Sequence, residues 1–80
     1  MALVRVQRLA SLDQAVRAAA GLPDPLVDAV YLRLQEYLDQ ELDGARYHTQ
    51  WLAVSGRHVR ATFFVDTDGT LNVDSLEASA

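Results

Sequence analysis

The sequence predicts a small α+β domain in which two helices pack on one face of a mostly antiparallel four-stranded sheet. Three observations lead to this expectation. Residues 3–8 alternate between apolar and polar side chains, residues 11–43 carry apolar side chains at helical spacing, and residues 46–76 are rich in β-branched and aromatic residues between turn signals. The expected order is β-α-α-β-β-β, in one domain of residues 1–80 with a flexible tail at residues 77–80.

The first strand and the first helix are short. Val4 and Val6 share one face of the strand, which we expect to pair at an edge of the sheet. Ser11 is the expected N-cap of the helix, because its hydroxyl can accept a backbone hydrogen bond from the first turn. Gly21 ends this helix, and Pro23 prevents its continuation.

The second helix is predicted to be longer. Asp24 and Pro25 form a start signal, and the helical pattern continues to about Asp43, with Gly44 as the C-cap. Leu32 falls outside the apolar side of this helix and is expected to be exposed. The apolar side itself consists of Val27, Val30, Tyr31, Leu34, Tyr37, Leu38 and Leu42.

Two hairpins are expected in the C-terminal half. Residues 55–57 and 67–69 each read as a three-residue loop, the second with glycine at its left-handed position. In this register Trp51 faces Ala61, and Trp51 and Phe63 share the face that the helices cover. A two-residue loop would instead place Trp51 opposite Arg60, so the three-residue loop is the better fit to the apolar pattern.

The predicted register leaves a mixed face exposed, with apolar side chains among Arg, His and Thr. Such a composition is typical of a contact surface. The side chains expected to bind a partner there are Leu52, Arg60, Phe64, Leu76 and His48. The acidic side of the second helix, with Glu36, Asp39 and Asp43, is a second candidate surface for a basic partner.

Several kinds of site are not expected. The chain has no Cys, and His48 and His58 lie too far apart in the predicted register to share a metal. Asp66 to Asn72 is similar to the middle of an EF-hand or dockerin calcium loop, but both principal carboxylate positions are lost, at Phe64 and Ser75. We therefore predict no catalytic residues, no cofactor, no metal and no small-molecule substrate.

The overall charge limits the partners. The formal net charge is −4, so nothing attracts the chain as a whole to nucleic acid or to anionic membranes. No apolar stretch is long enough to span a bilayer, and we expect a cytoplasmic location.

The expected function is protein binding through the outer sheet face. The chain would act as a homodimer or as an inhibitor, immunity or adaptor protein, by analogy with small domains encoded by phages and mobile elements. The alternative is a single-stranded nucleic-acid-binding domain that uses the Arg and aromatic side chains of the same face.

Overall fold

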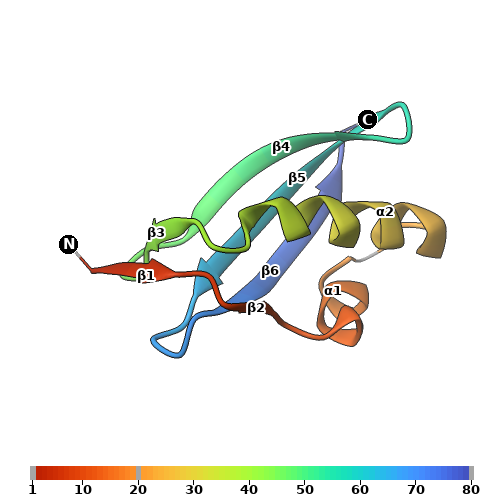
Figure 1. Cartoon of the computed structure of the whole chain (residues 1–80). Coiled ribbons are helices and arrows are strands. Elements are labelled where there is room, and N and C mark those ends of the chain that lie inside the picture. The colour runs from red at the N-terminus through yellow and green to blue at the C-terminus, as the bar shows by residue number, and fades with distance from the viewer. Residues whose placement is uncertain (1, 20, 80) are drawn as a thin grey trace.

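The computed structural model describes residues 2–19 and 21–79 and confirms an α+β fold (Figure 1). No helix in these ranges is long and apolar enough to cross a membrane. The elements are β1 (Leu3–Arg5), β2 (Arg8–Leu9), α1 (Leu12–Ala18), α2 (Asp24–Leu34), the 3₁₀ helix η1 (Gln35–Tyr37), β3 (Glu41–Asp43), β4 (His48–Val54), β5 (Arg57–Val65) and β6 (Thr70–Ala78).

The strands form two sheets rather than the single sheet that the sequence predicts. The larger sheet has the order β2-β6-β5-β4, and the smaller one pairs β1 with β3. The predicted first strand is divided at Val6, whose N–H donates to the Gln40 carbonyl and whose carbonyl accepts from Asp39. Its second part, β2, runs parallel to β6, while the other strand pairs are antiparallel.

The first helix begins as predicted, because the Ser11 hydroxyl accepts from the Gln14 N–H. The second helix begins at Asp24, preceded by Pro23 as N-cap, but it ends at Leu34 rather than near Asp43. After η1 the backbone takes a left-handed conformation at Asp39, with φ of 69°. Backbone pairing with Val6 and then with β1 replaces the last turns of the predicted helix.

Gly44 is consequently not a helix cap. It follows β3, and a Cβ at this position would lie 2.8 Å from Val4 Cγ2 and 3.3 Å from the Val65 carbonyl oxygen. The glycine therefore lets β1 and the end of β5 pack closely around the turn after β3.

The β4–β5 hairpin has a two-residue loop, so the predicted three-residue loop is wrong. Ser55 and Gly56 have φ angles of 52° and 75°, as a type I′ turn requires. Val54 pairs with Arg57, and Trp51 pairs with Arg60. The one-residue difference moves every side chain of β4 to the opposite face from the one predicted.

The β5–β6 hairpin confirms the predicted loop at residues 67–69. The Asp66 N–H donates to Thr70, and Gly69 has φ of 86°. Val65 pairs with Leu71 and Phe63 with Val73, as expected.

Beyond Val73 an irregularity in the ladder adds one residue, Asp74, to β6. Ser75 then pairs with Thr62, and Leu76 pairs with Ala61. The predicted tail is also wrong in part, because β6 continues through Ala78 and the Ser79 N–H donates to His58. Ala80 lies outside the described residues.

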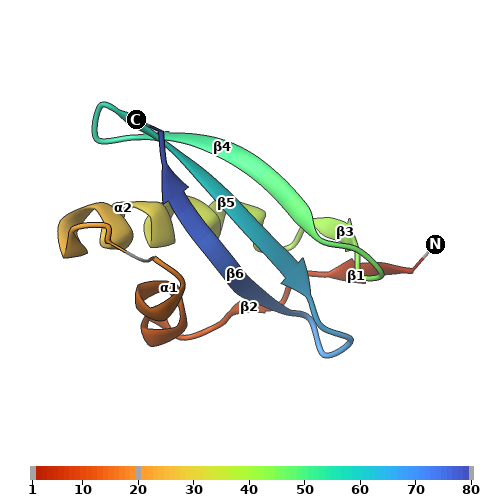
Figure 2. The same cartoon turned by 180° about the vertical axis from the view of Figure 1, so that it is seen from behind.

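Both helices lie on one side of the larger sheet, and the view from behind shows its other face uncovered by them (Figure 2). The covered face is hereafter the inner face, and the other is the outer face. The helices contribute the buried side chains of Ala15, Ala19, Leu26, Val27, Val30 and Leu34. The sheet contributes Leu52, Val54, Val59, Ala61, Phe63, Val65, Leu71, Val73 and Leu76.

Candidate interaction surface

The outer face is built by alternate residues of three strands. Residues that pair directly across antiparallel strands point to the same side of the sheet. Trp51 pairs with Arg60, and every second residue along each strand lies on the same side as this pair. The outer face comprises Thr49, Trp51 and Ala53 along β4, His58, Arg60, Thr62 and Phe64 along β5, and Asn72, Ser75 and Glu77 along β6. Tyr47, just before β4, lies against Phe64 on the same face.

Three of the five predicted contact residues are not on this face. Leu52 is 5% exposed and Leu76 is 1% exposed, and both belong to the core. His48 stacks on the buried Phe63 at 5.7 Å, and its Nε2 lies 2.9 Å from the Asp43 carbonyl oxygen. The two-residue turn moves Leu52 and His48 to the inner face, and the extra residue in β6 does the same for Leu76.

Arg60 and Phe64 do lie on the outer face, where two aromatic residues of the β4 region join them. Trp51 is 56% exposed and Tyr47 is 58% exposed. The Arg60 guanidinium carbon lies 5.9 Å from the Trp51 ring centroid, within the range of a cation–π contact. Tyr47 meets Phe64 edge to face at 5.2 Å.

The three-residue loop predicts Trp51 in the core, but one feature of the sequence favours the observed arrangement. Leu52 and Val54 alternate with Trp51 and Ala53, and either set supplies an apolar face. The Ser55-Gly56 pair was the deciding signal, because a glycine at the second turn position suits a type I′ turn.

The outer face carries one ion pair and one hydrogen-bonded carboxylate. Arg60 Nη2 donates to Glu77 Oε1 at 2.8 Å, directly across the β5–β6 ladder. Asn72 Nδ2 donates to Asp66 Oδ2, also at 2.8 Å. A shallow hollow of about 110 Å³ adjoins the aromatic pair and is lined by Gly44, Ala45, Arg46, Tyr47 and Phe64.

The predicted acidic helix face does not form. Glu36 lies in η1, Asp39 lies in the turn after it, and Asp43 ends β3. The Ala45 backbone N–H donates to the Asp43 carboxylate at 3.0 Å and lowers the pKa of that carboxyl group. These carboxylates therefore do not share one helix surface.

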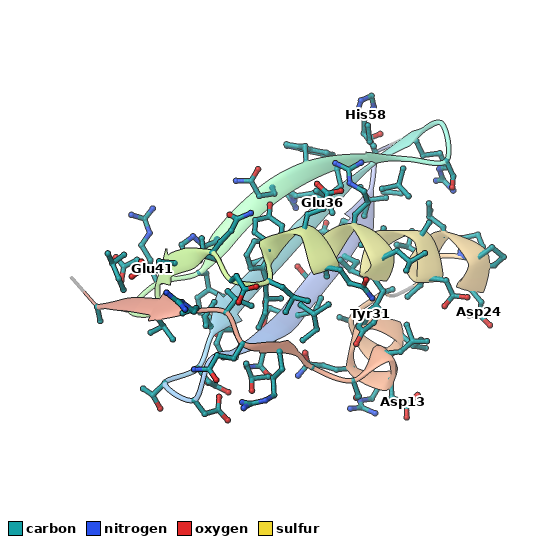
Figure 3. The ribbon with its side chains drawn as sticks, viewed as in Figure 1. Asp13, Asp24, Tyr31, Glu36, Glu41 and His58 are labelled. Carbon is teal, nitrogen blue, oxygen red and sulfur yellow. The ribbon has the colours of Figure 1, made fainter. Side chains whose placement is uncertain are left out.

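Backbone hydrogen bonds organise the acidic hairpin turn. The Asp68 carboxylate accepts from the Thr70 N–H at 3.0 Å, and this bond lowers the pKa of Asp68. Among residues 2–19 and 21–79, no three His, Asp or Glu side chains are grouped to hold a metal. Figure 3 shows His58 beside the β4–β5 hairpin, at the opposite end of the molecule from Glu41.

A second hollow, of about 350 Å³, lies beside the helices. It is lined by Leu12, Asp28, Tyr31, Leu32 and Gln35. Leu32 is 62% exposed, in agreement with its predicted position outside the apolar side of the helix. Tyr31 lies between α2 and α1 (Figure 3), and its hydroxyl donates to the Ala10 carbonyl at 2.7 Å.

Comparison of the chain with protein-family models, with curated proteins and with solved structures finds no match.

Proposed function

We propose that this protein is a non-enzymatic protein-binding module that docks its partner on the outer face. The observation that carries the proposal is the exposure of Trp51 and Tyr47 beside Arg60 and Phe64. Trp, Tyr and Arg are the residue types that most often dominate the binding free energy of protein interfaces. An inhibitor, immunity or adaptor role would use such a face.

The pairing of charges favours a protein partner over single-stranded nucleic acid. A nucleic-acid surface needs cations free to neutralise phosphates, together with aromatic rings for stacking. Here Arg60 is bound to Glu77, and Asp66 lies at the same face beside Asn72. The net charge of −4 adds a further repulsion for a polyanion.

The test is a pull-down from the native host with the wild-type protein and three variant forms, followed by titration calorimetry on the recovered partner. Trp51→Ala should weaken binding about thirtyfold, the effect of losing a contact of about 2 kcal/mol. Arg60→Ala should also weaken it. Leu32→Ala is the matched control, because it removes an equally exposed apolar side chain beside the helices.

The three forms separate the alternatives. Loss of binding in Leu32→Ala but not in Trp51→Ala would move the site to the hollow beside the helices. Recovery of nucleic acid instead of protein, with retention abolished at high salt, would establish the nucleic-acid function and overturn the proposal.

A further inference from the structure

Within residues 2–19 and 21–79, β4 has a neighbouring strand on one edge only. It is the end strand of the order β2-β6-β5-β4. Since Val54 and Arg57 close the two-residue loop, the even-numbered residues of β4 bond to β5, and Thr49, Trp51 and Ala53 direct N–H and C=O groups away from it. The Ala53 carbonyl accepts from Arg33 Nη1 at 2.8 Å, which confirms that it faces outward.

The opposite edge of the sheet, formed by β6, is covered over its first half. β2 pairs with the first residues of β6, at Thr70 and Leu71. Farther along, the Gln14 side chain of α1 accepts from the Val73 N–H and so occupies the next outward donor. Pairing of β4 with β4 is isologous, because each copy contributes the same edge, so the contact closes at a dimer.

Apart from Arg33 at the Ala53 carbonyl, the described residues give this edge little of the usual protection against pairing. Edge strands are commonly blocked by charged side chains, by Pro or by a covering segment. Residues 48–54 contain no Lys, Arg, Asp, Glu or Pro. The chain has a net charge of −4, so two copies repel each other overall. Because this strand carries no Asp or Glu, two copies can approach along it without direct repulsion between side chains.

We propose that two copies of this chain pair through β4, antiparallel, with the two-fold axis at Gln50. Thr49 then bonds to Trp51 of the second copy, and the reverse pair completes the ladder. This register leaves the Ala53 carbonyl with Arg33. Gln50 points toward the inner face but is exposed, so the helices leave room for Gln50 of the second copy opposite it.

The dimer extends the binding surface of the proposed function. The axis is perpendicular to the sheet, so the two outer faces become one surface of an eight-stranded sheet. The two Trp51 side chains are then diagonal neighbours across the new ladder, a spacing of about 7–8 Å at which aromatic rings touch. The contact covers part of the exposed Trp51 ring and leaves Arg60, one strand further in, unobstructed.

The test is a charge swap at the axis, measured by sedimentation equilibrium. Gln50→Lys and Gln50→Glu each place two like charges opposite each other at the closest type of pair, and each should weaken the dimer about tenfold or more. An equimolar mixture of the two variants should restore the dimer as a heterodimer. Gln7→Lys and Gln7→Glu, at an exposed position near the covered edge, are matched controls and should leave the wild-type dimer unchanged.

Three results would overturn the inference: a wild-type protein that is monomeric at high micromolar concentration, a dimer unaffected by either change at Gln50, or a mixture that stays monomeric. Recovery of the dimer on mixing shows at the same time that both variants are folded. Arg60→Ala should keep the dimer while it weakens partner binding, so a failure of the edge pairing is distinguishable from a failure of the proposed function.

Discussion

Two residues with positive φ decide which side chains of β4 reach solvent. Ser55 and Gly56, with φ of 52° and 75°, close the hairpin in two residues. Glycine takes such angles without strain, but serine pays a penalty because its Cβ crowds the following carbonyl. The molecule tolerates this strain in a turn whose twist matches that of the two strands.

Ser55→Asn should therefore stabilise the protein. Asn adopts the left-handed conformation more readily than Ser, so we expect the free energy of unfolding to rise by a few tenths to about 1 kcal/mol. Urea unfolding measures the change. A loss of stability would argue against the type I′ turn, and with it against the whole register of β4.

Because the pKa of Asp68 is lowered, part of the free energy of unfolding should be sensitive to acid. The Thr70 N–H lowers the pKa of Asp68 in the folded state. A lowered pKa stabilises the fold above the unfolded-state value of about 3.9, and this contribution disappears as the pH falls through the folded-state value. Asp68→Asn should thus lower the melting temperature at pH 7 and make progressively less difference below pH 4. An equal difference at both pH values would contradict this account.

At the scale of elements, β4 carries the main distinction between core and surface. Leu52 packs under the helices at 5% exposure, while its neighbour Trp51 is 56% exposed. Leu52→Ala should cost about 2–5 kcal/mol of unfolding free energy, the usual range for a buried leucine. Trp51→Ala should cost far less, although it removes the larger side chain. Urea unfolding of both variants measures this, and the reverse order would contradict the observed register.

Elements defined by local chemistry were predicted well. The Ser11 cap and the loop at residues 67–69 depend on contacts within a few residues, and both are confirmed. The pairs Val65–Leu71 and Phe63–Val73 follow directly from that loop.

Elements decided by distant contacts were not predicted. Helical periodicity continues past Leu34, but pairing with Val6 and β1 ends the helix. The extra residue Asp74 leaves no signature in a strand that alternates regularly up to Val73. In β4 the odd-numbered and the even-numbered residues can each supply an apolar face. An error of one residue in the loop therefore placed Trp51 in the core instead of Leu52 and misplaced most of the candidate site.

In the molecule as a whole, the helices form a layer on only one face of the larger sheet and leave the other uncovered (Figure 2). The uncovered face holds exposed aromatic side chains beside the Arg60–Glu77 ion pair. Binding at such a face should depend on apolar burial more than on net charge. The affinity for the partner should change less than about threefold between 50 and 200 mM salt, whereas phosphate contacts would reduce it by orders of magnitude.

The central claim is that the outer face presents Trp51 to solvent, and Trp51 is the chain's only tryptophan. Its fluorescence, measured at high dilution with increasing acrylamide, therefore reports on this one side chain. We expect emission typical of a solvent-exposed indole and efficient quenching that unfolding in urea increases only modestly. Blue-shifted emission that resists quenching until the protein unfolds would place Trp51 in the core and contradict the account.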